Sequence, residues 1–177
     1  FFQYVAFTAP HWPLHAWVED IAKYEGRYMQ GWDAIRTARH EEMKGLGIID
    51  PKWPISARDE DSPPWESVAN KNYEDIKMAT YSAMIEQVDH EFGRLLDHLE
   101  AIGERENTIV VFMSDHGEAL CDHGLLLKGC RFFEGLTRVP LMISWPGKYR
   151  KDVVSDALVE LVDLVPTFLD AAGLETP

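Results

Sequence analysis

An apolar run of six residues that gives way at once to charged residues sets the fold class of this chain. Residues Thr108 to Met113 read TIVVFM, a series of β-branched and aromatic side chains. Such a run predicts a strand that is buried on both faces, as in a parallel sheet covered by helices. The next residues, Ser114 to Glu118, read SDHGE. Because open α/β sheets bind ligands beyond the carboxyl ends of their strands, we expect a functional site to begin here.

The remaining periodicity predicts an α/β fold with a mostly parallel sheet flanked by helices. The expected elements are a strand at residues 1–7, a long helix from Asn72 to Ile102, a buried strand from Val139 to Ser144, a short edge strand from Ala157 to Leu161 and a closing helix from Asp163 to Ala172. Apolar residues of the long helix recur every three or four positions and predict its buried stripe. They are Ile76, Tyr81, Met84, Ile85, Val88, Phe92, Leu95, Leu96 and Leu99.

Residues 17–70 are richer in charge, Trp and Pro than the rest of the chain, which predicts an excursion from the sheet. Its first part has helical character and is expected to end near Gly45 or Gly47. Trp53 and Trp65 are expected to anchor the following loop to the protein body, because Trp is mostly buried. Stacking on a carbohydrate is the alternative role for these two side chains.

The net charge and the lack of a long apolar run argue against two classes of protein, nucleic-acid-binding and membrane-spanning proteins. The chain has 177 residues and a net charge of −13, with only 17 Lys and Arg, so we expect no nucleic-acid binding. No apolar run of about 18 residues is present, so no membrane span is expected. The first residues already read as a strand, which indicates a piece of a longer protein. The sequence does not indicate an oligomeric state.

Five residues are candidates for a site. Asp115 and His116 offer a hard oxygen and a nitrogen to one cation, with Gly117 permitting the irregular loop that this requires. His123 and Lys128 follow at short range, and an ammonium near a metal favours anion binding. His11 lies just past the first predicted strand. The alternatives are ordinary loop residues with solvated charges, and for His11 a half-buried ring beside a Trp.

Four stretches of the sequence carry a resemblance to a known family. They are TAPHWPLHA (8–16), NTIVVFMSDHGEAL (107–120), DHGLLLKG (122–129) and RVPLMISWPG (138–147). These stretches resemble the sulfatase family of the alkaline phosphatase superfamily. VDHEFGRLLDHL before the second stretch and LVDLVPTFLDAAGL after the last resemble helices of that family. The similarity keeps the family's order and spans nearly the whole chain. It implies the carboxyl-terminal portion of a sulfatase catalytic domain over residues 1–177, with an insertion at about 17–70.

The resemblance also implies roles for the candidate residues. Asp115 and His116 match two ligands of the calcium ion that holds the sulfate, although another divalent cation is possible. Lys128 matches the lysine that contacts the sulfate, and His11 the histidine beside the leaving-group oxygen; His123 is expected to contribute to substrate binding. The implied substrate is a sulfated small molecule or glycan, and the implied location is periplasmic, secreted or lysosomal.

The sequence departs from the family at the nucleophile. Sulfatases use a formylglycine made from the Cys or Ser of a C/S-x-P-x-R motif, and neither Cys121 nor Cys130 lies in such a motif. The family's early acidic metal ligands are also missing. We expect both upstream of this chain, which alone should then be inactive. Two alternatives stay open: a phosphonate monoester or phosphodiester hydrolase of the same superfamily, and a non-catalytic relative that binds anions or glycans.

Overall fold

The computed structural model describes residues 1–119, 123, 125 and 127–176. The chain divides into two compact units, residues 1–98 and 99–177. Cys121, one of the two cysteines considered as a nucleophile, lies outside the described residues. Cys130 is an exposed free cysteine. No helix among the described residues combines the length and apolar composition needed to cross a bilayer.

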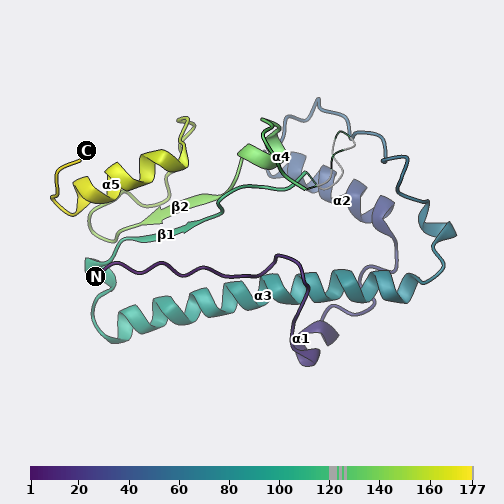
Figure 1. The fold of residues 1–177 in the computed structure, drawn as a ribbon, viewed down its shortest axis with the longest axis horizontal. Helices are drawn as coiled ribbons and strands as arrows, with labels where there is room; N and C mark the ends of the chain where they lie inside the picture. The colour runs from purple at the N-terminus through teal and green to yellow at the C-terminus, as the bar shows by residue number, and fades with distance from the viewer. Residues whose placement is uncertain (120–122, 124, 126, 177) are drawn as a thin grey trace. The chain divides into compact units, whose positions relative to one another are not determined.

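The first unit is built on the long helix α3, Lys71–Ala101, which continues three residues into the second unit. This confirms the predicted helix to within one residue at each end. Asn70 caps its start, since the Asn70 side-chain oxygen accepts the Tyr73 N–H at 3.1 Å. Gly103, at φ 74°, follows its end, and the Glu104 N–H donates to the Leu99 carbonyl. Figure 1 shows α3 as the longest helix of the chain.

The face of α3 that is buried differs from the predicted stripe. The buried residues are Asp75, Ala79, Thr80, Ala83 and Met84, of which only Met84 belongs to that stripe. Ile85 is 46% exposed. The apolar periodicity predicts the face that carries large apolar side chains. The face that is buried instead carries small side chains such as Ala79 and Ala83, which let neighbouring backbone approach closely. His90 and His98 are exposed, as expected.

A buried carboxylate joins α3 to the segment that follows α1, Val18–Ala22. Asp75 is 3% exposed and accepts the backbone N–H groups of Gly26 at 2.6 Å and Tyr28 at 2.8 Å. The Tyr28 hydroxyl is also hydrogen-bonded to the Ser82 hydroxyl. The two backbone bonds satisfy the oxygens of the Asp75 carboxylate, which burial would otherwise leave without partners.

The excursion carries the helix α2, Trp32–Gly45, and the short 3-10 helix η1, Trp65–Ser67. Trp65 is buried and donates its indole N–H to the Met29 carbonyl at 3.0 Å, which confirms its predicted anchoring role. A Cβ at Gly31 would lie 2.3 Å from the Trp65 ring, so this glycine makes room for the indole. Trp53 is 46% exposed, so the prediction of a second anchor is wrong.

The second unit contains two short strands. β1, Val110–Met113, pairs with β2, Leu141–Ser144, in an antiparallel register that places Val111 opposite Ile143. Side chains of β2 alternate between half-buried and exposed, which is typical of a strand with one covered face. The parallel pairing and the two-sided burial that the sequence predicts are therefore not observed within the described residues.

Helices and turns complete the second unit (Figure 1). They are η2 Arg105–Asn107, α4 Glu134–Thr137, η4 Leu161–Asp163 and α5 Leu164–Ala171. The Asp163 carboxylate accepts the Glu160 N–H at 2.8 Å, which fixes the turn into α5 where the closing helix is predicted. No strand forms at residues 157–161, whose side chains are exposed, so the predicted edge strand is wrong.

The predicted strand at residues 1–7 is also absent from the described sheet. Its aromatic residues are exposed, with Phe1 at 91% and Phe2 at 81%. A strand needs a neighbour to pair its N–H and C=O groups, and the composition of a segment cannot supply one.

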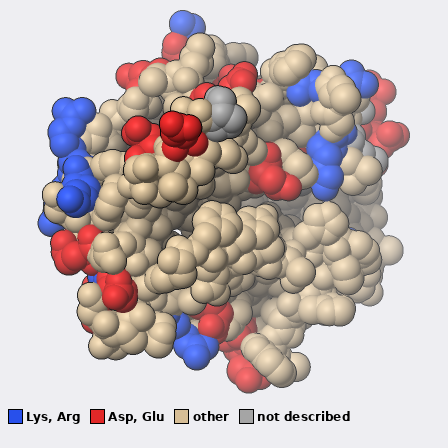
Figure 2. Space-filling view, turned by 60° about the vertical axis from the view of Figure 1, so that its left-hand side comes forward, with Lys and Arg blue, Asp and Glu red and all other residues tan. Residues whose placement is uncertain are grey.

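On the face drawn in Figure 2, uncharged residues cover most of the surface and charged residues form separate spots. Large exposed apolar side chains such as Phe1 and Phe2 are typical of a surface that other polypeptide covers.

Candidate active site

The loop that follows β1 is fixed by hydrogen bonds to α4. The Gly117 N–H donates to the Leu136 carbonyl at 2.8 Å, and the Glu118 N–H donates to the Gly135 carbonyl at 3.1 Å. A Cβ at Gly117 would lie only 1.8 Å from the Gly135 carbonyl oxygen. Glycine is therefore required at position 117 by this close approach of two backbone segments, rather than for loop flexibility.

Asp115 and His116 lie side by side in this loop. The Asp115 carboxylate accepts the His116 backbone N–H at 3.0 Å, and its other oxygen lies 3.6 Å from His116 Nε2. His116 Nδ1 lies 2.8 Å from the Gly117 carbonyl oxygen. Because a carbonyl only accepts hydrogen bonds, Nδ1 is the donor in this contact, and Nε2 is left available to a cation.

This geometry suits a shared divalent cation. A ring whose Nδ1 donates to a backbone carbonyl is the usual arrangement of a metal-binding histidine. The side chains of Asp115 and His116 are 78% and 45% exposed, so a cation would reach both from solvent. No third His, Cys, Asp or Glu side chain converges with them within the described part of the chain. A hard cation prefers about six to eight oxygen ligands, so this pair is only part of such a site.

Lys128 and His123 belong to the same region of the second unit. The Ala119 N–H, one residue after Glu118, donates to the Leu127 carbonyl at 2.9 Å, which brings the segment before Lys128 back to the loop after β1. Lys128 is exposed. His123 is also exposed, and its ring stacks on Phe133, with the ring centroids 4.1 Å apart and an interplanar angle of 19°. Backbone bonds, and for His123 the stacking on Phe133, thus tie four of the five candidate residues to one region.

His11 belongs to the first unit and is described within it. The His11 N–H donates to the Thr8 carbonyl at 2.9 Å, forming a tight turn. Nδ1 lies 2.6 Å from the Trp12 carbonyl oxygen, so Nδ1 is the donor here as well. Trp12 is 71% exposed and His11 is exposed, which contradicts the alternative of a half-buried ring packed beside Trp12. A second proton on Nε2 would make the imidazolium, the form that donates to a leaving-group oxygen.

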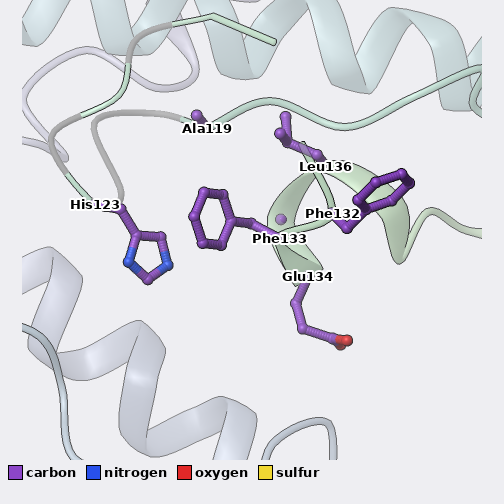
Figure 3. Close-up of a pocket in the computed structure, with 7 residues that line it drawn as sticks. Ala119, His123, Phe132, Phe133, Glu134 and Leu136 are labelled. Atoms are coloured by element: carbon purple, nitrogen blue, oxygen red, sulfur yellow. The ribbon is translucent and has the colours of Figure 1, made fainter. Parts of the chain in front are cut away.

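A pocket that the sequence did not reveal lies beside the loop after β1. It has a volume of about 280 Å³. The residues lining it are Ala119, His123, Phe132, Phe133, Glu134, Gly135 and Leu136. Figure 3 shows the Phe133 ring directed toward His123, and Phe132 on the opposite side of Phe133. The only signal in the sequence is the pair of adjacent phenylalanines in a connection otherwise expected to be an ordinary loop.

Comparison with known proteins identifies relatives of the chain. A family model described as Sulfatase matches residues 1–174. An uncharacterized sulfatase of Schizosaccharomyces pombe is 33% identical over the whole chain, which covers 40% of that protein. An N-acetylglucosamine-6-O-sulfatase of Bacteroides thetaiotaomicron is 36% identical over 82% of the chain and 29% of its own length. An arylsulfatase of Clostridium perfringens is 39% identical over 63% of the chain and 24% of its own length.

Proposed function

The chain belongs to the sulfatase family of the alkaline phosphatase superfamily, and from that premise we propose that it forms the cation-binding and sulfate-binding part of a sulfate ester hydrolase. The chain spans less than half the length of these relatives, so the proposal concerns the whole protein. The observation that carries it is the loop after β1, where an Asp115 oxygen and His116 Nε2 lie 3.6 Å apart. The reaction would break a sulfate ester with water, giving inorganic sulfate and an alcohol.

Asp115 and His116 would hold the divalent cation, which is calcium by family resemblance. When bound, the cation would supply positive charge at the sulfate oxygens. The bond from His116 Nδ1 to the Gly117 carbonyl would keep Nε2 directed to the cation. Gly117 and Glu118 would hold the loop in place through their bonds to α4.

Lys128 would bind the sulfate group as a point charge. A sulfate ester is anionic before the reaction and its negative charge shifts toward the leaving oxygen during it, so an ammonium is useful in both states. His123 would add a donor near the same group, although its stacking on Phe133 gives it a second use in shaping the adjacent pocket.

His11 would donate a proton or hydrogen bond to the leaving oxygen, with its Nδ1 bond to the Trp12 carbonyl orienting the ring. The nucleophile, a formylglycine by family resemblance, is expected upstream of this chain. We therefore expect residues 1–177 alone to hydrolyse an aryl sulfate no faster than background. A periplasmic, secreted or lysosomal location is likewise part of the proposal.

The reaction class is tested with two esters that share one leaving group. The full-length protein is assayed with 4-nitrophenyl sulfate and with the 4-nitrophenyl ester of phenylphosphonate, comparing kcat/KM. We expect the sulfate to be the better substrate. Lys128→Ala should lower kcat/KM for 4-nitrophenyl sulfate by about 10²- to 10³-fold, the usual loss on removing one charge-stabilising group. Lys151→Ala, an exposed lysine of the same unit, is the control and should change it little.

Two results would contradict the proposal. A higher kcat/KM for the phosphonate ester would assign the protein to the phosphonate hydrolases of the superfamily. Absence of turnover of both esters, in a protein shown by mass spectrometry to carry the formylglycine, would assign it to non-catalytic relatives.

A further inference from the structure

We propose that Leu127 is a positioning residue whose left-handed backbone conformation places the Lys128 ammonium for contact with the sulfate. Leu127 has a φ of 63° and directly precedes Lys128. The inference rests on the proposed function and adds to it the residue that controls the anion-binding group.

Left-handed backbone gathers in this part of the chain. Among the described residues, three that are not glycine have a positive φ, namely His123 at 58°, Leu127 at 63° and Asp152 at 54°. Two of the three therefore lie in the stretch 123–128, which carries two of the candidate substrate-binding residues. Strained backbone conformations of this kind cluster at functional sites, where the surrounding structure holds them in place.

Lys128 lies between two residues of positive φ. Leu127 precedes it, and Gly129 follows it at φ 136°. A Cβ at Gly129 would meet nothing within 4 Å, so glycine is favoured there by the backbone conformation rather than by lack of space. The Gly129 carbonyl also accepts the Arg131 N–H at 2.8 Å. The course of the backbone on each side of the lysine is thus set by a conformation that most side chains disfavour.

Leucine is an unfavourable residue for the left-handed conformation. The Cβ of an ordinary side chain comes too close to the following carbonyl oxygen, whereas glycine, asparagine and aspartate adopt this conformation more readily. Leu127 is 67% exposed, so packing of its side chain within the described residues does not offset the strain. The conformation must therefore be held by the backbone.

A backbone hydrogen bond holds Leu127 against the loop after β1. The Leu127 carbonyl accepts the Ala119 N–H at 2.9 Å, and Ala119 is 5% exposed. The two residues before Ala119, Gly117 and Glu118, are bonded in turn to α4. These bonds fix the backbone next to Lys128 relative to the loop. A lysine side chain is flexible, so a fixed backbone limits the positions that its ammonium can reach.

Substitutions at position 127 separate the backbone conformation from the side chain, in the full-length protein with 4-nitrophenyl sulfate. Leu127→Ile keeps an apolar side chain of equal size, but its β-branch disfavours the left-handed conformation further. Its kcat/KM should fall by about 10- to 100-fold, since a misplacement of about 1 Å can have that cost. Leu127→Asn loses the apolar side chain but tolerates the conformation, so it should keep kcat/KM within about threefold.

Asp152→Ile is the matched control for strain, because Asp152 is exposed and left-handed but lies outside the candidate site. This variant should lower the urea midpoint of unfolding while changing kcat/KM less than about twofold.

A double-mutant cycle tests whether Leu127 acts through Lys128. In the Lys128→Ala background, Leu127→Ile should lower kcat/KM less than about twofold, because the group that it displaces is already gone. Equal losses in the two backgrounds, or a Leu127→Asn protein as impaired as Leu127→Ile, would overturn the positioning role.

Urea denaturation separates this inference from the proposed function. At position 127 the midpoint should rise from Ile to Leu to Asn, because the cost of the left-handed conformation falls in that order. A Leu127→Ile protein as stable as the unmodified one would overturn the inference even if sulfate is released. Absence of sulfate release by the unmodified protein would overturn the proposed function, and the role of Leu127 with it, even if this order of stability holds.

Discussion

At the scale of single residues, the two candidate histidines share one hydrogen-bonding arrangement. Both His11 and His116 place Nδ1 near a neighbouring backbone carbonyl, at 2.6 and 2.8 Å. Nδ1 is the donor in each contact, and Nε2 is left to interact with a cation in one case and with a leaving group in the other. The different proposed roles of the two rings therefore follow from their surroundings, because Asp115 lies next to His116 and an exposed turn surrounds His11.

The role of His11 is testable with leaving groups of different basicity. If His11 donates to the leaving oxygen, His11→Ala should lower kcat/KM for an alkyl or sugar sulfate by about 10² or more, because an alkoxide needs the proton. The loss on 4-nitrophenyl sulfate should be much smaller, since nitrophenolate is a stable anion. His90→Ala, an exposed histidine on α3, is the control. Equal losses on both substrates would show that His11 only orients the sulfate.

At the scale of elements, the loop after β1 depends on a backbone contact with α4 that permits no side chain. Gly117→Ala would force its Cβ against the Gly135 carbonyl, 1.8 Å away, so the loop or α4 must shift. We expect the free energy of unfolding of the full-length protein to fall by about 1 to 3 kcal/mol, as for overpacked sites, with weaker cation binding. Urea denaturation measures this loss.

Gly93→Ala is the matched control for that experiment. Gly93 lies inside α3, and a Cβ there would meet nothing within 4 Å. Alanine favours helix over glycine by up to about 1 kcal/mol, so this variant should be neutral or stabilised. A Gly117→Ala protein as stable as the Gly93→Ala protein would show that the contact between the loop and α4 does not constrain the loop.

Elements set by local sequence could be predicted, and those set by distant partners could not. The ends of α3 follow from Asn70 and Gly103, which act on their own neighbours. The loop after β1 follows from the change of composition at Ser114. Pairing of residues 1–7 and the antiparallel register of β1 depend on which strand lies beside each, which composition does not encode. The pocket beside the loop after β1 escaped prediction for the same reason, since a turn of the chain brings Phe133 to His123.

At the scale of the whole molecule, the described chain has few buried apolar residues and many exposed ones. The buried apolar residues are Trp65, Ala79, Ala83, Met84, Ala119, Leu136 and Leu164. Phe1, Phe2 and Val154 are each more than four-fifths exposed. The candidate cation site is likewise incomplete within the described residues, because Asp115 and His116 supply only two ligands. The relatives are more than twice as long as the matched region, which is consistent with a site completed by other polypeptide.

The most direct test of this account is the calcium dependence of sulfate release by the full-length protein. Activity on 4-nitrophenyl sulfate is measured against free calcium for the unmodified protein, Asp115→Ala and the control Asp156→Ala, an exposed aspartate of the same unit. We expect the unmodified and control proteins to share one half-activating concentration. Asp115→Ala should need at least about 100-fold more calcium or show no activity, because losing a partner of a metal ligand already costs about 10- to 100-fold and losing the ligand itself costs more. An unchanged calcium dependence in Asp115→Ala would contradict the account.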